Sequence, residues 1–545
     1  MQNMVRSIVL SVLLPLAAYG QPAPADVIVF NGKGFTADAA NPSAEAIAMH
    51  GEHIIAVGTS AEIAALAGAH TRRIDVQGHM VVPGFNDAHF HFGPNPQGFT
   101  LQFKTMEPSW PETGAAIAQA VQQTPAGTWI FGFVGHDVVL NEQGTRLTLD
   151  QLAPHHPVLL RAYYGHGYIM NSQAMPLLQM VEDEPDPAGG YYERVAGSQR
   201  INGRFWEYAE WKPHRLLANQ VADEDAIQAL RQMAEEAMRF GITSMQIFPA
   251  MSVERCAQLL VKANVPIRVR AIPFSMTSPT GRDLSEIQQL GRLQLPPAKV
   301  NVSGIKWVVD GTPFERGAAL RRDYNDRPGW RGRLNFPASD IAAMVQESLD
   351  FHQQLLLHSV GDKTTEVIFD ALEQTGDGQV EWKPKRVRIE HGDGVIDDLI
   401  PRARTLGVIV VQNPTHFSQP ALFRQRWGPQ MFPLRSLLEA GIPLALGSDG
   451  PMNPFLNLMF ATLHPYNPQE AITREQAVRA YTEGSAFAEF AEQDKGTIAK
   501  GKLADIVVLS QDIFAVPVPE LPKTRSVLTI VGGTAVYDAH VLPAQ

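Results

Sequence analysis

The chain has 545 residues, of which 45% are hydrophobic and 19% are charged, with 44 glycines and 40 prolines. This composition is typical of a loop-rich globular protein too long for one small domain, and it excludes a disordered or fibrous chain. The net charge of −11 and the absence of a basic run argue against nucleic acid and anionic membrane surfaces as partners.

Residues 1–20 have the features of a signal peptide. An arginine precedes the apolar run SIVLSVLLPLAA, and the small residues Ala18 and Gly20 are spaced like a cleavage site before Gln21. The run is short for a membrane span, although an uncleaved anchor is the alternative. Cys256 is the only cysteine, so no intramolecular disulfide can form. We expect a periplasmic or secreted protein with no stable membrane anchor after cleavage.

Both ends of the mature chain contain short apolar runs separated by turns. These runs occupy residues 27–35, 46–58, 73–85, 503–510 and 527–538. Because chain ends commonly lie close together, residues 21–79 and 496–545 are predicted to form one small β-sandwich domain. Residues 461–495 are predicted to be a helical segment that links this domain to the middle of the chain.

The middle of the chain, residues 80–460, alternates apolar strand patterns with helix patterns, which is typical of βα units. Eight strands are predicted, at residues 80–89, 242–248, 267–274, 300–310, 355–360, 386–391, 408–413 and 443–449. Eight such units close an α/β fold of the (β/α)8 TIM barrel type. Residues 92–240 are too many for a simple loop, so we expect an insertion with its own structure on the catalytic rim.

Residues that commonly bind metals lie at or just after five of these strands. They are His89, His91, Lys306, His358, His391 and Asp449. In a parallel barrel the carboxyl ends of all strands meet at one rim, so these side chains are expected to converge. Neutral imidazole is the commonest metal ligand at physiological pH, and a carboxylate beside a metal can be a ligand or a general base. The pattern predicts a metal centre.

Each of these residues also has a structural interpretation. His89 and His91 could be surface histidines, His358 and His391 hydrogen-bonded structural histidines, and Asp449 a helix N-cap. Lys306 lies among apolar residues, so burial should lower the pKa of its amine. A neutral amine can react with CO₂ to form a carbamate that bridges two metals. The alternative is an ion pair with Asp310.

The sequence around these residues resembles the amidohydrolase superfamily, and within it the amidohydrolase family 3 branch, which includes N-substituted formamide deformylases. The resemblance covers nearly all of the mature chain and rests on the segments VVPGFNDAHFH, GIKWVVDGTPFERGAAL, LLLHSVGDK, RVRIEHGD, GIPLALGSDGP and GTIAKGKLADIVVL.

The resemblance implies a role for each of the six residues. His89 and His91 would hold a first metal, and carboxylated Lys306 would bridge it to a second. His358 and His391 would hold the second metal. Asp449 would bind the first metal and shuttle a proton. The expected metal is zinc, as one or two ions, although iron, manganese or nickel suits the same ligands.

Two segments depart from the family pattern. The chain has Tyr164–Gly165–His166 where relatives usually have Asp-Gly-His, and an extra residue in the segment that ends at His416. His166 and His416 are candidate contacts for the substrate or its oxyanion. Each could instead be a loop histidine with a structural hydrogen bond.

The leading hypothesis is a secreted metal-dependent amidohydrolase that cleaves a C–N bond of a small amide, formamide or related molecule. A hydroxide generated at the metal would attack the carbonyl. Alternatives are an esterase or carbamate hydrolase with the same site, a non-catalytic periplasmic binding protein, and a lyase or isomerase. The sequence does not identify the substrate or the oligomeric state, and a homo-oligomer is one possibility.

Overall fold

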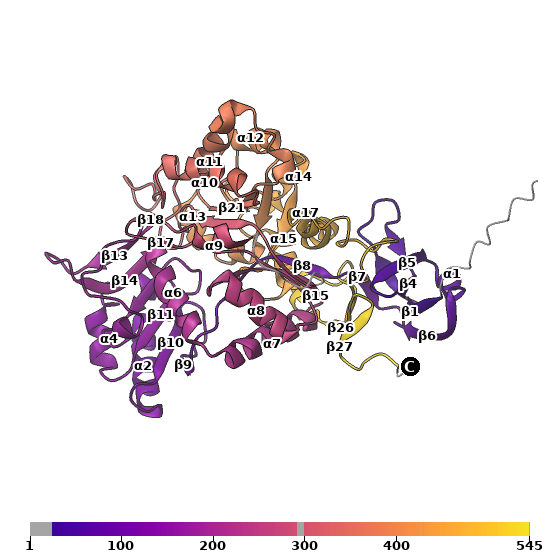
Figure 1. Cartoon of the computed structure of the whole chain (residues 1–545), viewed down its shortest axis with the longest axis horizontal. Coiled ribbons are helices and arrows are strands. Elements are labelled where there is room, and N and C mark those ends of the chain that lie inside the picture. Colours follow the sequence, from indigo (N-terminus) through magenta and orange to yellow (C-terminus); the bar gives the residue numbers. More distant parts are fainter. Residues whose placement is uncertain (1–23, 291–298, 429, 544–545) are drawn as a thin grey trace, which may run out of the picture.

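The computed structural model describes residues 24–290, 299–428 and 430–543, and the protein has an α/β fold (Figure 1). The predicted signal peptide lies outside these residues. In the described part of the chain, no helix is both long enough and apolar enough to cross a membrane.

Two parallel sheets occupy the middle of the molecule. The first has the order β19-β16-β15-β8, formed by Val300–Val302, Arg268–Ala271, Ile242–Pro249 and Phe85–Phe92. The second has the order β20-β21-β22-β23-β24, formed by Ile305–Val308, Leu355–Ser359, Arg388–His391, Ile409–Gln412 and Leu444–Leu446. Every residue of β21, β22 and β23 is buried, which explains the apolar runs in β21 and β23.

The two parallel sheets contact each other at both edges. Phe274, just after β16, forms an isolated parallel bridge with Lys306 of β20. At the other edge, the backbone N–H of Asp449, just after β24, donates to the carbonyl of His89 in β8 over 2.9 Å. The carboxyl ends of these strands therefore lie next to one another.

Two predicted strands are wrong in their extent. Residues 80–89 were expected to form a single strand, but β7 (Met80–Pro83) belongs to a sheet made from both chain ends, whereas β8 belongs to the first parallel sheet. Residues 300–310 were expected to form a single strand, but β19 and β20 belong to different sheets. Gly304 lies between them with a φ of +94°, which is outside the extended region. An added Cβ on Gly304 would lie 2.9 Å from Leu356 Cδ1, so a larger residue would also collide with β21.

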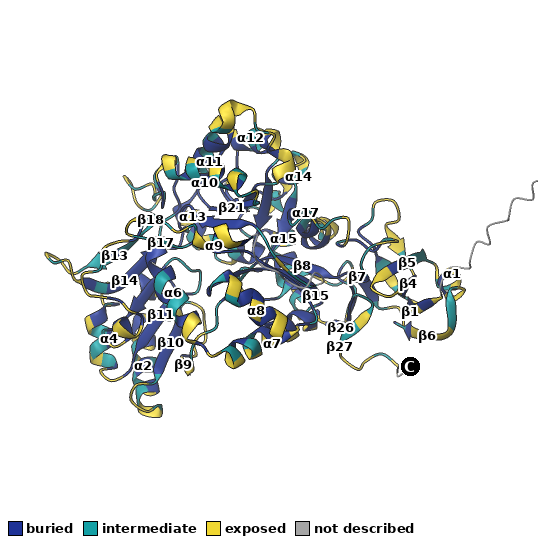
Figure 2. Ribbon diagram, viewed as in Figure 1, coloured by how far each residue is buried: buried dark blue, intermediate teal, exposed yellow. Residues whose placement is uncertain are grey.

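Helices cover the outer faces of the parallel strands, and their solvent faces are exposed (Figure 2). They include α7 (Asp223–Arg239), α8 (Val253–Ala263), α10 (Ala338–Asp350), α11 (Asp362–Gln374) and α12 (Leu399–Leu406). The buried residues of α7 include Ala226, Leu230 and Ala237, at the spacing of one helical face. The α8 helix begins at an N-cap, Ser252, and ends at Asn264 in the left-handed conformation.

The long segment between β8 and β15 forms a sheet of its own. Its order is β13-β14-β12-β11-β10-β9, formed by Gly190–Arg194, Ile201–Glu207, Tyr168–Met170, Val158–Ala162, Trp129–Val134 and Gly98–Thr100. Two hydrophobic clusters include its strands. One includes residues of α2 (Trp110–Gln123) and the other Leu217 of α6 (Tyr208–Gln220). We call this segment the inserted sheet.

Strands from both ends of the chain pair in one sheet. β7 (Met80–Pro83) is antiparallel to β25 (Ile506–Leu509), in the order β27-β26-β25-β7-β2-β3. A second sheet, β5-β4-β1-β6, consists of N-terminal strands and shares a hydrophobic cluster with the first. Both lie on the side of the molecule away from the inserted sheet (Figure 1). The domain boundaries given above stay predictions.

The remaining strands of these two terminal sheets range from two residues in β3 to nine in β6. The first sheet also contains β2 (Lys33–Phe35), β3 (Ser43–Ala44), β26 (Ser526–Val531) and β27 (Thr534–Asp538). The second contains β1 (Ala25–Phe30), β4 (Ala46–His50), β5 (His53–Gly58) and β6 (Ala67–Asp75).

Candidate metal centre

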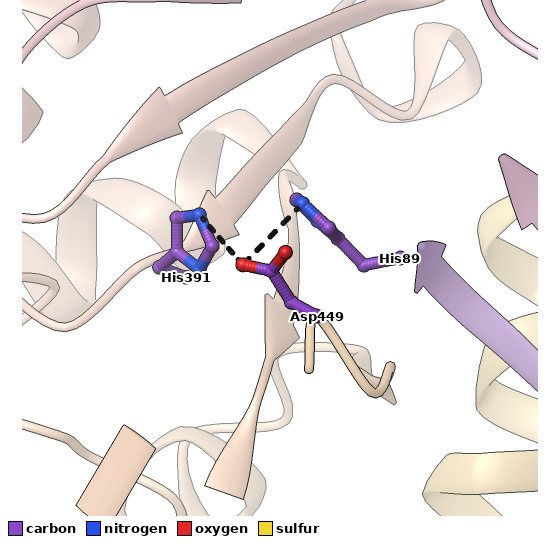
Figure 3. A group of neighbouring side chains, drawn as sticks. All are labelled: His89, His391 and Asp449. Carbon is purple, nitrogen blue, oxygen red and sulfur yellow. Dashed lines mark ion pairs between the residues drawn. The ribbon is translucent and has the colours of Figure 1, made fainter. Parts of the chain in front are cut away.

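Three residues distant in sequence bring ligand atoms together at the carboxyl ends of the parallel strands. His89 lies in β8, His391 ends β22, and Asp449 follows β24. One ligand atom from each lies within 4.8 Å of the other two. The Nε2 atoms of His89 and His391 are 3.8 Å and 3.9 Å from Asp449 Oδ2, and both rings point toward this carboxylate (Figure 3).

The other predicted residues surround the same carboxylate. His91 Nε2 is 3.8 Å from Asp449 Oδ1, and His416 Nε2 is 3.5 Å from Asp449 Oδ2. The His358 ring centroid is 4.5 Å from that of His391 and 4.8 Å from that of His166. Lys306 lines one cavity together with His91, His358, His391 and Asp449. The structure thus brings all eight predicted site residues into one neighbourhood.

In three of the histidines, Nδ1 lies close to an oxygen of a neighbouring side chain. His89 Nδ1 lies 2.5 Å from Glu390 Oε2, and His391 Nδ1 lies 2.9 Å from Asn413 Oδ1. His358 Nδ1 lies 3.3 Å from Asp310 Oδ1. An oxygen beside Nδ1 favours the tautomer that carries its proton on Nδ1. The lone pair of Nε2 is then free to bind a metal, which is the usual arrangement of metal-binding histidines.

The His89 partner is itself held by a buried arginine. Arg388 Nε donates to Glu390 Oε1 over 2.7 Å, and Nη2 donates to Glu390 Oε2 over 3.1 Å. Nη2 also donates to the carbonyl of Ala88, which precedes His89. None of these side chains is exposed to solvent. The Arg388–Glu390 pair therefore fixes both the ring and the backbone of His89.

Four imidazoles of this centre, those of His89, His91, His358 and His391, are neutral. Burial lowers the pKa of His89, His358 and His391 well below the usual 6.5, and it lowers the pKa of His91 to about 4 despite the nearby Asp449. Burial opposes ionisation of Asp449, yet the surrounding histidines hold the pKa of its carboxyl well below the usual range. Neutral imidazoles beside an ionised carboxylate are a donor set that binds divalent cations.

The buried nitrogens at the centre that have no hydrogen-bond partner within the described residues include His89 Nε2 and Lys306 Nζ. Burial lowers the pKa of the Lys306 amine to about 8, although Glu390 and Asp449 oppose this. Its Nζ lies 4.3 Å from the centroid of the Phe248 ring. Because an unpaired buried polar atom is costly, both atoms fit a site that is completed by a bound cation.

Several site residues have strained backbones. The φ angles of His391, Asp449 and His166 are +67°, +36° and +62°, and that of Glu207 is +56°. Non-glycine residues rarely adopt this left-handed region, and such residues gather at functional sites. In Asp449, the strained backbone accompanies the hydrogen bond from its N–H to His89, which holds the carboxylate over the histidines.

A cavity with two lobes opens at the centre. The apolar lobe has a volume of about 520 Å³. The residues that line this lobe but not the other include Met106, Phe314, Phe423, Phe432, Leu456 and Phe460. The polar lobe has a volume of about 300 Å³. The residues that line this lobe but not the apolar lobe include His91, Arg161, Trp211, His214 and Lys306. Both are lined by His166, His358, His391, His416 and Asp449. The candidate metal centre therefore lies where the lobes meet.

His166 comes from the inserted sheet rather than from a parallel strand. Its Nδ1 lies 2.8 Å from Glu207 Oε2, which also accepts from Asn335 Nδ2 over 2.9 Å. Burial lowers the pKa of His166, but the Glu207 contact outweighs it and raises the pKa to about 10. His166 thus differs from the other histidines because it is a cation with a carboxylate partner.

Sequence reasoning missed the groups that support the ligands. Glu390, Arg388, Asn413 and Arg161 received no role, and Asp310 appeared only as a partner for Lys306. One signal was available: Arg388 and Glu390 are charged residues inside the strand pattern RVRIEH, and charges in a buried strand need partners. The same signal marked Arg161, which lies inside the apolar pattern PVLLRAYY, but the sequence did not show which residues from other segments surround it.

Comparison with known proteins agrees with this geometry. The model of the amidohydrolase family matches residues 72–537. This chain belongs to the amidohydrolase family. The family expected from the sequence is confirmed, and the chain is a hydrolase of a family that acts on carbon–nitrogen bonds. The matched segment includes every predicted metal ligand.

Individual relatives cover almost the whole chain. An N-substituted formamide deformylase of Arthrobacter pascens is 27% identical, over 94% of this chain and 98% of its own length. The protein LONG AFTER FAR-RED 3 of Arabidopsis thaliana is 26% identical, over 94% of this chain and 92% of its own. The crystal structure of an uncharacterized metal-dependent hydrolase from Pyrococcus horikoshii has a TM-score of 0.69 at 20% identity, and covers 90% of this chain and 99% of that one. This last similarity supports the fold.

Proposed function

We propose that this amidohydrolase cleaves the C–N bond of a small amide or formamide with the help of one or two divalent cations. The observation that carries the proposal is the convergence of neutral, buried imidazoles on the ionised carboxylate of Asp449 at the meeting point of the two lobes. The similarity to an N-substituted formamide deformylase supports the choice of bond.

The proposed architecture is a closed (β/α)8 barrel with a β-sandwich domain made from both chain ends. The contacts at both edges of the two parallel sheets support closure. The pairing of β7 with β25, and the cluster shared by the terminal sheets, support the sandwich. In a barrel, catalytic side chains lie at the carboxyl ends of the strands, where these ligands are.

The proposed metal ligands are His89, His91 and Asp449 for one cation and His358 and His391 for a second. Lys306, as a carbamate, would be the bridge between them. Its buried amine, with a pKa of about 8, is partly neutral at physiological pH and could react with CO₂. Zinc suits these nitrogen and oxygen donors best.

Divalent cations bound here would polarise a carbonyl and lower the pKa of a water molecule. The Asp449 carboxylate, which is partly open to the cavity, accepts the proton of the attacking water and passes it to the leaving nitrogen. His166 and His416, which line both lobes, contact the substrate or the oxyanion that develops on the carbonyl.

The remaining proposals concern the setting of the enzyme. The pattern of residues 1–20 supports export to the periplasm or the medium. The size of the cavity, with lobes of about 520 Å³ and 300 Å³, supports a small-molecule substrate. Neither nucleic acid nor a membrane is proposed as a partner, because the chain is acidic.

The test is hydrolysis of paired substrates by the purified, metal-loaded protein. N-formyl and N-acyl amines are compared with esters of the same acyl groups, in water enriched in ¹⁸O. We expect faster turnover of the amides, with the label in the acid product. Label-free products would indicate lyase or isomerase chemistry, and ester-only turnover would indicate an esterase. Binding without turnover of any substrate would indicate a binding protein.

A further inference from the structure

The two lobes of the cavity differ in charge as well as in polarity. Among the described residues that the lobes do not share, the polar lobe contains the guanidinium of Arg161. The apolar lobe contains one acidic side chain, Asp393, and burial raises the pKa of its carboxyl well above the usual value. Since the candidate metal centre lies between the lobes, a substrate bound there extends into both. Its two ends therefore meet different surroundings.

Arg161 has unused hydrogen-bonding capacity. It lies in β11 of the inserted sheet, and its Nη1 is 3.3 Å from Nε2 of His214. Its guanidinium carbon lies 5.7 Å from the centroid of the Tyr168 ring. In the described part of the chain it forms no ion pair within 4.0 Å and no other hydrogen bond. A guanidinium has five N–H donors, and its planar fork matches a carboxylate.

The groups around Arg161 do not replace such a partner. Burial lowers the pKa of His214 well below its usual value, so this ring is neutral and accepts from Arg161. Glu210 of α6 is buried and close enough to interact electrostatically with Arg161, but neither of its oxygens has a hydrogen-bond partner. Burial raises the pKa of Glu210 to about 7 although Arg161 opposes this, so a substantial fraction of this carboxyl is neutral at neutral pH.

We propose that Arg161 binds an anionic group of the substrate, so that the enzyme prefers amides with a carboxylate on one side of the scissile bond and a bulky apolar group on the other. The carboxylate lies in the polar lobe and the apolar group among Phe314, Phe423 and Phe460 of the apolar lobe. This inference rests on the proposed function, because it names the substrate class of the same site.

The substrates that test it form two matched pairs. N-benzoylglycine is compared with N-isobutylbenzamide, in which an isopropyl group replaces the carboxylate on the amine side. Succinic acid monobenzylamide is compared with N-benzyl-4-methylpentanamide, which makes the same replacement on the acyl side. We expect kcat/KM to be about 10–100-fold higher for the carboxylate member of at least one pair, since hydrogen bonds to a charged group are strong. The successful pair identifies the side that carries the anion.

Variants then assign the preference to Arg161. In Arg161→Met, the ratio of kcat/KM between carboxylate and neutral members should fall to near one, and in Arg161→Lys to an intermediate value. The control is Arg200→Met, which removes an exposed arginine of the inserted segment that pairs with Glu182 on the surface. This control should keep the full ratio.

Three outcomes overturn the proposal or its basis. Equal turnover of both members of both pairs in the wild type refutes the anion subsite but leaves the proposed function intact. An unchanged ratio in Arg161→Met with a lower melting temperature identifies Arg161 as a structural partner of Glu210. If no amide is hydrolysed at all, the proposed function fails. Calorimetric binding of N-benzoylglycine, lost in Arg161→Met, would then show whether the anion subsite exists independently of turnover.

Discussion

The parallel strands and the inserted sheet contribute to one cavity in different ways. The strands supply His89, His358 and His391, which are neutral, and Nδ1 of each lies near an oxygen of a neighbouring side chain. The inserted sheet supplies His166 and Arg161, which are cations that line the same cavity. Under the proposed function, the strands determine the chemistry and the insertion determines which molecule undergoes it.

The strongest test of this division removes a strand histidine. We expect His358→Ala to lower the amount of bound metal and to abolish turnover, because His358 packs against His391 at the centre. Metal is measured by mass spectrometry of the purified protein, and turnover with an amide substrate. His155→Ala, which removes an exposed histidine, is the control. Full activity in His358→Ala would contradict its assignment as a ligand.

The next test separates metal binding from proton transfer. Asp449→Asn keeps the size of the side chain but removes its basicity, so most of the metal should remain. Turnover should fall on the order of 10³–10⁴-fold, the upper range for a lost general acid–base group. Asp183→Asn, at an exposed position, should behave like the wild type. A variant that retains wild-type kcat would show that another group shuttles the proton.

A smaller effect is expected when the support of a ligand is weakened. Glu390→Gln retains a hydrogen-bond acceptor for His89 but loses the charge that pairs with Arg388. Metal affinity should fall about 10–100-fold, as is typical when the partner of a metal-binding histidine is changed. The measurement is competition with a chromophoric chelator. Unchanged affinity would mean that Glu390 serves only the fold.

The neutral state of the strand histidines has a consequence for stability in the metal-free protein. The folded-state pKa of His91 is about 4 and its unfolded value is about 6.5, so below pH 6.5 the unfolded chain binds more protons at this residue. Relative to His91→Gln, the wild type should therefore lose stability as the pH falls from 6.5 to 4, by up to about 3 kcal/mol. Denaturant unfolding of both proteins with chelator measures this difference. A difference independent of pH would show that the pKa of His91 is the same in the folded and unfolded states.

The smallest effect is expected for a substitution in the inserted sheet where it lines the cavity. Phe133 of β10 lines both lobes and is 44% exposed. Phe133→Ala should raise KM for a benzyl-substituted amide several-fold and leave kcat and the bound metal unchanged, because a partly exposed ring contributes little beyond contact with the substrate. A fall in kcat or in metal content would contradict the assignment of substrate selection, rather than chemistry, to the inserted sheet.

The sequence was most informative where structure follows from strand order. His89, His391 and Asp449 could be predicted to meet because the carboxyl ends of parallel strands share one side of a sheet. The break at Gly304 was missed, since an apolar run gives no sign that its two halves join different sheets. Arg161 could not be assigned, because the strand order of the inserted sheet depends on tertiary pairing that local patterns do not encode.

The most direct test of the account is the metal dependence of turnover in the intact protein. The purified protein is analysed for bound metal, stripped with a chelator, assayed with an amide substrate, and assayed again after zinc is returned. The account predicts one or two equivalents of metal, loss of amide hydrolysis on stripping and recovery on reloading. Undiminished hydrolysis by the stripped protein would contradict it.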